Sequence, residues 1–305
     1  MMRNLHMEIS DKLPNFLVIG GMKCATTTMH QDLSTHPGIE CGQKELNALT
    51  WFGDSYPGRP TPAEVYKKNF RHAVPNQLLG DVSTTYTMNP QYEGIAQRAR
   101  DLLGPRLKLI FIARNPVMRT ISHHQHMLNQ ANGMGPDINI EIDQHPELIG
   151  FSRYADQLSV WIDRFSISNL RVVKFEDYVS DRSEMVDSII SFLGLEPHAM
   201  DGDNAGANRT GDARVASSGI KRISGSRMFQ TMVRPLMPPF VRNLLRPVLL
   251  KRTVKAHIAP TMKTIDRIIE GIEDDQQRFC ELVGWRHPAW DFQAVRDKYR
   301  VQSPS

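Results

Sequence analysis

Short apolar runs alternate with amphipathic segments along this chain. The apolar runs 16–19, 77–81, 107–113 and 170–177 have the length and the branched or aromatic content of strands buried in a parallel sheet. Apolar residues at helical spacing predict helices over 26–36, 63–72, 92–103, 151–165, 185–193 and 264–282, and Asn115 and Pro116 open a further helix. The stretch 133–146 is expected to be a loop. This order of elements predicts an α/β protein with a central parallel sheet flanked by helices.

The first strand-to-helix junction carries candidate binding chemistry. Gly20 and Gly21 end the first strand, and the next helix is expected to begin at Thr26. The start of a helix leaves backbone N–H groups unpaired next to the positive end of the helix dipole, and phosphate is the usual anion there. Lys23 adds a full charge, and the three consecutive threonines add hydroxyl donors. We therefore predict a phosphate-binding loop; the alternative is an ordinary turn capped by a threonine.

The residues of this loop exclude two common phosphate chemistries. A nucleotide triphosphatase loop needs Gly-Lys-Ser/Thr in succession, whereas Cys24 and Ala25 separate Lys23 from Thr26. A cysteine phosphatase would want an arginine shortly after Cys24, and the next arginine is Arg59. Cys24 is expected to be a small loop residue whose pKa the helix N-terminus lowers, which would make the thiol somewhat reactive.

The segment Met22-Lys23-Cys24-Ala25-Thr26-Thr27 resembles the 5′-phosphosulfate-binding loop of sulfotransferases that use 3′-phosphoadenosine 5′-phosphosulfate (PAPS). The resemblance implies a P-loop-like architecture and a donor site made of Lys23, Cys24, Ala25, Thr26, Thr27 and Thr28. The family usually has glycine where this chain has Ala25. The extra methyl group is accommodated there if the φ angle of Ala25 is negative.

A second motif follows the strand over 107–113. Arg114 stands at the carboxyl end of that strand and Ser122 two turns into the next helix, so both can face one ligand at the edge where open α/β sheets bind ligands. Arg-x-Pro-x-x-Arg-x-x-Ser is similar to the 3′-phosphate-binding element of the same sulfotransferases, with Arg114 and Ser122 as the contacts. Arg119 is given a lesser role, in packing or pairing within the helix.

A charged pair, Lys44 and Glu45, precedes the apolar segment that ends at Phe52. This stretch is similar to the one that supplies the catalytic base in sulfotransferases of the heparan sulfate group, and the likeness makes Glu45 the residue that deprotonates the acceptor. The alternative is a solvated surface pair before a core segment. Related enzymes also carry a lysine near the reacting centre where this chain has Val82.

Two later stretches extend the resemblance. Residues 208–214 are rich in Gly and Asn, and bacterial sulfotransferases often carry Asn-x-Ser-Gly-x-x-Arg in such a place; Arg214 is therefore expected to contact the cofactor as part of a lid, with Arg209 beside it. The C-terminal stretch with Trp285 and Trp290 resembles the closing segment of the family. We assign 14–290 to a single sulfotransferase domain that carries a basic, proline-containing arm at about 213–258.

Composition and charge limit the kinds of partner that the protein can have. The chain has 305 residues, 40% of them hydrophobic, which is enough for one large α/β domain. No apolar run reaches the length of a membrane span, the N-terminus lacks the apolar segment of a signal peptide, and three scattered cysteines fit a reducing cytoplasm. The net charge of +4 hides a segment, 213–265, with eleven Lys or Arg and no acidic residue. Such a segment fits phosphates, an acidic acceptor, an anionic membrane surface or a solvated face without a partner.

The sequence therefore predicts a PAPS-dependent sulfotransferase without a metal, with Glu45 and Lys23 as catalytic residues. The acceptor is expected to be a hydroxyl or amine of a carbohydrate or glycolipid, and the location cytoplasmic, with peripheral contact between the basic arm and the inner face of the membrane. No nucleic acid is expected as a partner, and the oligomeric state stays open. The residues leave two alternatives, a P-loop kinase and a non-enzymatic polyanion-binding protein. His123, His124 and His126 lie on different faces of a helix, which disfavours a zinc site.

Overall fold

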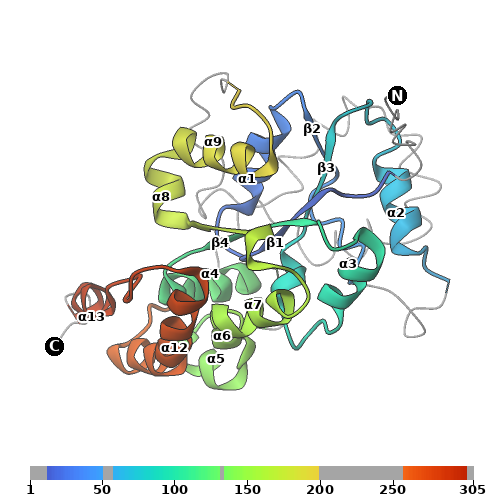
Figure 1. The fold of residues 1–305 in the computed structure, drawn as a ribbon. Helices are drawn as coiled ribbons and strands as arrows, with labels where there is room; N and C mark the ends of the chain where they lie inside the picture. Colours follow the sequence, from blue (N-terminus) through green and yellow to red (C-terminus); the bar gives the residue numbers. More distant parts are fainter. Residues whose placement is uncertain (1–11, 51–57, 131–133, 199–256, 301–305) are drawn as a thin grey trace, which may run out of the picture.

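A five-stranded parallel sheet forms the centre of the molecule (Figure 1). The computed structural model describes residues 12–50, 58–130, 134–198 and 257–300. The strands are β1 (Phe16–Gly20), β2 (Ile39–Cys41), β3 (Leu78–Val82), β4 (Lys108–Ala113) and β5 (Leu170–Lys174). They lie in the order β2-β3-β1-β4-β5, and every pair is parallel. The predicted α/β class with a central parallel sheet is confirmed.

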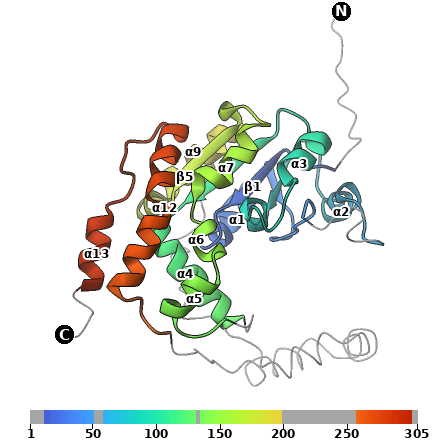
Figure 2. The ribbon, with the colours of Figure 1, turned by 90° about the horizontal axis from the view of Figure 1, so that it is seen from below.

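Helices cover both faces of this sheet. In Figure 1, α1 (Thr26–Ser34), α8 (Phe175–Ser180) and α9 (Arg182–Leu193) lie on one side, and α4 (Pro116–Asn129), α7 (Tyr154–Ile162) and α12 (Met262–Val283) on the other. Figure 2 shows α13 (Phe292–Arg300) along the outer side of α12. The remaining described helices are α2 (Pro62–Asn69), α3 (Ile95–Leu103), α5 (Ile138–Gln144), α6 (Glu147–Gly150) and the 3₁₀ turns η1 (Thr84–Thr87) and η2 (Ile167–Asn169). None of the described helices is both long and apolar enough to span a membrane.

The central strand explains why two cores form. Successive side chains of a strand point to opposite faces, and β1 is apolar on both. Leu17 and Ile19 join the larger core with α3, α7, α12 and α13, while Phe16 and Val18 join the smaller core with α1 and α9. All four side chains are fully buried. β1 is therefore fixed from both sides, together with the loop that follows it.

A buried polar contact fixes the helix after that loop. The carboxylate of Asp32 on α1 accepts hydrogen bonds from Tyr178 on α8 and from the guanidinium of Arg182 at the start of α9. Asp32 is 3% exposed, so breaking this contact would leave a buried charge unpaired. The smaller core thus holds α1 by charge as well as by apolar packing.

Three elements differ from the sequence-based predictions. Residues 138–144 form α5 and not a loop, because Asp137 caps the helix by accepting from the Asn139 N–H at 2.9 Å and two isoleucines pack inward. β5 ends at Lys174, whereas the strand was predicted to reach residue 177; residues 175–177 instead begin α8. The short strand β2 has three residues, too few for an apolar run to reveal it.

The carboxyl ends of the parallel strands meet at one edge of the sheet. Gly20 marks this edge on β1, with φ at +157° and so little space that a β-carbon would meet the Thr87 hydroxyl at 2.1 Å. The segments that leave this edge are 21–25 after β1, 42–47 after β2, 83–87 after β3 and 114–115 after β4. These segments hold Lys23, Cys24, Ala25, Glu45 and Arg114 of the residues that the sequence analysis selected, and the three threonines follow at the start of α1.

Candidate active site

The loop over 21–25 has the backbone of an anion-binding loop. Both Lys23 and Ala25 are left-handed, with φ angles of +68° and +62°, and the first helical N–H to bond backwards is that of Met29, to the Ala25 carbonyl at 3.0 Å. No side chain caps α1, and its first turn holds no acidic residue that would repel an anion. Lys23 is half-buried; burial, aided by the nearby cations of Arg114 and Lys44, lowers the pKa of its ammonium below the usual value.

Two expectations for this loop are wrong. Ala25 does not have a negative φ; it takes the left-handed conformation that favours glycine, and its methyl group is accepted beside the smaller core. Cys24 is not an activated thiol, because its side chain is fully buried in that core and burial raises its pKa to about 11. Its Sγ contacts the Met22 carbonyl at 3.5 Å. Only the backbone of Cys24 is therefore available to a ligand.

Arg114 joins the two predicted phosphate motifs. Its Nη1 donates to the Lys23 carbonyl at 3.1 Å, and its guanidinium lies over the Phe175 ring, 4.7 Å from the centroid. The Tyr154 hydroxyl bonds to both the backbone N–H and the carbonyl of Arg114, at 3.3 and 2.8 Å. The arginine that ends β4 thus lies against the loop that follows β1, as two parts of one anion site require.

Helix α4 is positioned by Glu176, a residue that the sequence analysis did not select. Asn115 caps the helix by accepting from the N–H groups of residues 117 and 118 at 3.1 and 3.2 Å. The backbone N–H of Asn115 donates to Glu176 Oε1 at 2.9 Å, and Trp290 Nε1 donates to Glu176 Oε2 at the same distance. Glu176 stands in the segment Phe-Glu-Asp-Tyr directly after β5. Its carboxylate ties the C-terminal stretch to the helix that carries Ser122.

The sequence predicts different roles for two side chains of α4, Ser122 and Arg119. Ser122 is 6% exposed and lies one turn before His126 on the same helix face. Arg119 is 1% exposed and donates to the Ser152 hydroxyl at 2.6 Å and to the Leu148 carbonyl at 2.9 Å. Arg119 therefore packs within the protein, and Ser122 stays a predicted contact of the 3′-phosphate.

Glu45 is held by a neighbouring loop. Its carboxylate accepts from the Thr84 backbone N–H at 3.0 Å and from the Thr84 hydroxyl at 3.1 Å, and its own N–H donates to the Val82 carbonyl at 2.9 Å. Lys44 Nζ lies 2.5 Å from Glu45 Oε1. About a third of the Glu45 side chain stays exposed, so the carboxylate is fixed and still reachable. Sequence reasoning missed Thr84, which has no motif of its own.

The last two residues of β3, Asp81 and Val82, are buried and stabilise the fold. Val82, at the position where related enzymes have a lysine, is 1% exposed and belongs to the smaller core. Next to it, the buried carboxylate of Asp81 accepts from Tyr66, Tyr86 and Ser83 at 2.9, 2.5 and 2.6 Å. Burial raises the pKa of Asp81 despite these bonds. This network fixes the turn that brings Thr84 to Glu45.

The histidines of α4 have different surroundings. Burial lowers the pKa of His126 to about 4, with smaller effects from the charges of Lys23, Glu45 and Lys44. His123 is 2% exposed, and burial lowers its pKa to about 2. Within the described ranges, no group of three or more His, Cys, Asp or Glu could hold a metal ion.

The predicted lid residues and most of the basic arm lie outside the described residues. These are Arg209, Arg214 and the arm up to residue 256.

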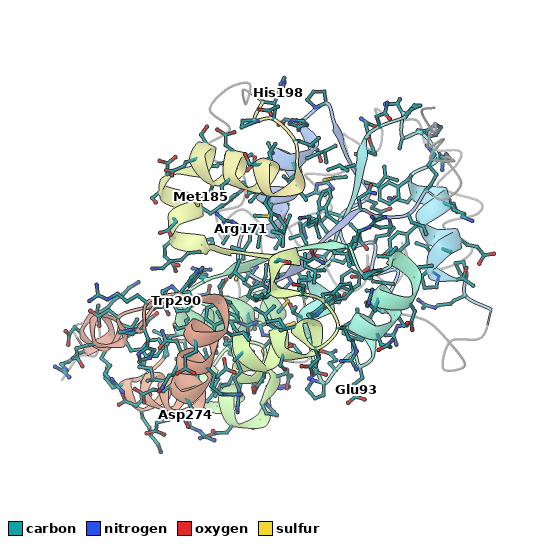
Figure 3. All side chains as sticks on the ribbon, in the orientation of Figure 1. Glu93, Arg171, Met185, His198, Asp274 and Trp290 are labelled. Atoms are coloured by element: carbon teal, nitrogen blue, oxygen red, sulfur yellow. The ribbon has the colours of Figure 1, made fainter. Side chains whose placement is uncertain are left out.

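A cavity of about 550 Å³ lies along the outer edge of β5 and is lined in part by Arg171 and Met185, both labelled in Figure 3. None of the residues that line it belongs to the predicted site.

Comparison with known proteins agrees with these observations. The chain is 26% identical over 216 residues to the mouse bifunctional heparan sulfate N-deacetylase/N-sulfotransferase 4, covering 62% of this chain and 23% of that protein. It is 26% identical over 200 residues to the human heparan sulfate glucosamine 3-O-sulfotransferase 6, covering 61% and 53%. The chain thus matches between about a quarter and a half of the length of these relatives.

The fold is also shared with a solved structure. The crystal structure of a sulfotransferase from Alicyclobacillus acidocaldarius superposes with a TM-score of 0.60 at 19% identity, covering 91% of this chain and 98% of that one. A family model described as the sulfotransferase family matches residues 14–199, more than half of the chain. The chain therefore belongs to the sulfotransferase family.

Proposed function

We propose that this protein transfers the sulfuryl group of PAPS to a hydroxyl or amine of an acceptor. The observation that carries the proposal is the 3.1 Å hydrogen bond from Arg114 Nη1 to the Lys23 carbonyl, which joins two anion-binding motifs at one edge of the sheet. PAPS has two anionic ends, the 5′-phosphosulfate and the 3′-phosphate. The loop with Lys23, Thr26, Thr27 and Thr28 suits the first, and Arg114 with Ser122 suits the second.

The reaction is a direct transfer. The acceptor oxygen or nitrogen attacks sulfur while Glu45 takes its proton, and the bond between sulfur and the bridging phosphate oxygen breaks. The electron pair of that bond stays on the phosphate of the product, adenosine 3′,5′-bisphosphate (PAP). Lys23 and the first amides of α1 stabilise this growing charge by electrostatics. This chain contributes position and charge, as in phosphoryl transfer.

The names of the relatives support a proposal for the acceptor class. Both curated relatives are named for heparan sulfate, which supports a saccharide or a lipid-linked saccharide as the acceptor. The basic segment 213–265 supports an acidic acceptor or contact with an anionic membrane, and with it a cytoplasmic location next to the membrane.

The test begins with the nucleotide. PAP should raise the melting temperature without magnesium, because at 100 times its Kd a ligand adds about 2.7 kcal/mol to the stability. ATP should raise it far less. Stabilisation by ATP that appears only with magnesium would favour a kinase, and salt-sensitive binding of heparin without any nucleotide effect would favour a polyanion-binding protein.

The chemistry is tested with radiolabelled PAPS and a panel of saccharides, glycolipids and phenols. Glu45→Gln keeps the shape of the side chain but cannot take a proton, so transfer should fall by about 10²- to 10⁴-fold with PAP affinity nearly intact. Lys23→Ala should reduce both. A Glu45→Gln protein with the wild-type rate on its acceptor would exclude Glu45 as the base.

A further inference from the structure

The segment that carries Lys44 and Glu45 is fixed at the carboxyl end of β3. The Gly42 N–H donates to the Gly80 carbonyl at 3.1 Å, and the Glu45 N–H donates to the Val82 carbonyl at 2.9 Å. From the other side, His30 on α1 bonds to the Gly42 carbonyl at 2.7 Å. The segment therefore lies between the last residues of β3 and the helix that follows the phosphate loop.

The backbone conformation brings the ammonium of Lys44 and the carboxylate of Glu45 together. Side chains of consecutive residues on a strand point to opposite faces, but Glu45 has a φ angle of +57° and leaves the strand geometry. As a result, Lys44 Nζ lies 2.5 Å from Glu45 Oε1. The Lys44 side chain is only 21% exposed, less than that of Glu45, so this is not a solvated surface pair.

The Lys44 ammonium can bind a second anion. Lys44 is among the charges that lower the pKa of Lys23 and of His126. The carboxylate of Glu45 contacts Lys44 and also accepts two hydrogen bonds from Thr84. At the end of β3, Val82 is buried in the smaller core and the buried Asp81 carboxylate accepts from Tyr66, Tyr86 and Ser83. An ammonium group has three N–H donors and Glu45 accepts one of those of Lys44, so donors remain for a negatively charged ligand beside the proposed base.

We propose that Lys44 is the second cation of the reacting centre and binds the sulfuryl oxygens of PAPS. This rests on the proposed function. Lys23 acts on the phosphate that departs, whereas Lys44, through its contact with Glu45, lies where the base meets the group that is transferred. No bond to Lys44 forms or breaks: the acceptor proton goes to Glu45, and the ammonium steadies the negative oxygens on sulfur.

A comparison of PAPS binding with PAP binding tests this role of Lys44. PAPS carries the sulfuryl group and PAP lacks it, so a residue that binds the sulfuryl oxygens discriminates between them. Lys44→Met should weaken PAPS binding tenfold or more and change PAP binding less than twofold, and Lys44→Arg should restore most of the loss. Lys68→Met, the same change of charge on an exposed residue of α2, is the matched control and should alter neither affinity.

Affinities are measured by calorimetry or competition on proteins whose melting temperatures match. An equal loss for both ligands, or wild-type PAPS affinity in Lys44→Met, would overturn the proposal. Failure of the wild-type protein to bind PAP would instead overturn the proposed function, so the two failures are separate. A Lys44→Met protein that melts early is replaced by Lys44→Gln, for which the same PAPS-selective loss is expected.

Discussion

Thr84 holds the carboxylate of Glu45 at two points, with its backbone N–H at 3.0 Å and its hydroxyl at 3.1 Å. The two residues are 39 positions apart in the sequence and meet because the segments after β2 and β3 leave neighbouring strands. The proposed base is thus held in one direction while about a third of its side chain stays exposed to solvent. Turnover should therefore depend on a threonine that needs no contact with substrate.

Thr84→Val removes the hydroxyl and keeps the backbone N–H and the shape of the side chain. A hydrogen bond to a charged group contributes about 1.5–3 kcal/mol, so we expect sulfuryl transfer to fall by about 10- to 100-fold while the Kd for PAP stays the same. Thr84→Ser should recover most of the rate. A loss of PAP affinity equal to the loss of rate would assign Thr84 to the donor site instead.

Arg114→Ala tests the site for the 3′-phosphate. The variant should bind PAP more weakly by about 1.5–3 kcal/mol, the size of a charge-assisted hydrogen bond. The fold should survive, because Tyr154 bonds to the backbone of residue 114 and not to its side chain. Adenosine 5′-phosphate, which lacks the 3′-phosphate, serves as the matched ligand in calorimetry and should lose much less. Equal losses for both nucleotides would place the role of Arg114 in the loop of Lys23.

Ala25→Gly should stabilise the protein. An L-residue in the left-handed region costs about 1–2 kcal/mol, and glycine avoids this cost but loses more backbone entropy on folding. We expect a net gain of about 0.5–1 kcal/mol in the free energy of unfolding, measured with urea. Ala99→Gly in the interior of α3 is the control and should cost about 2 kcal/mol, because it loses helix propensity and also a buried methyl group. A destabilised Ala25→Gly protein would mean that the methyl group contributes packing worth more than the strain.

His123 predicts a dependence of stability on pH. Burial lowers its pKa from 6.5 to about 2, so the folded protein keeps the ring neutral while the unfolded chain takes up a proton below pH 6.5. Stability is thus fully present above pH 6.5 and falls as the pH drops, by about 1.4 kcal/mol per pH unit for this group. In His123→Gln, the loss between pH 7 and 5.5 should be smaller by about 1–2 kcal/mol. Identical pH slopes in the two proteins would contradict the assignment.

Local chemistry determined what could be predicted. The strand, loop and helix from β1 to α1 were evident because glycines, a lysine and threonines follow one another within a few residues. The same holds for Arg114 and Asn115 after β4. Each junction needs only its own residues to form, so the parallel sheet and the position of both candidate anion-binding segments could be inferred from the chain alone.

The rest depends on contacts between distant segments. Nothing near Thr84 in the sequence indicates that it holds Glu45, because their approach requires β2 and β3 to pair. The thiol of Cys24 was assigned from the helix dipole, yet burial in the smaller core decides its pKa. The φ angle of Ala25 is likewise imposed by the path of the loop and is not readable from the residue type.

The link from Asn115 through Glu176 to Trp290 has a consequence for synthesis. Glu176 and Trp290 are 114 residues apart, an interval that a ribosome translating about 5–20 residues per second covers in roughly 6–23 s. During that time one carboxylate oxygen of Glu176 can already accept from the Asn115 N–H at the start of α4, whereas the other cannot accept from Trp290 until that residue is made. A chain released before residue 290 would therefore contain both candidate anion-binding motifs but would lack the hydrogen bond that joins the start of α4 to the C-terminal stretch.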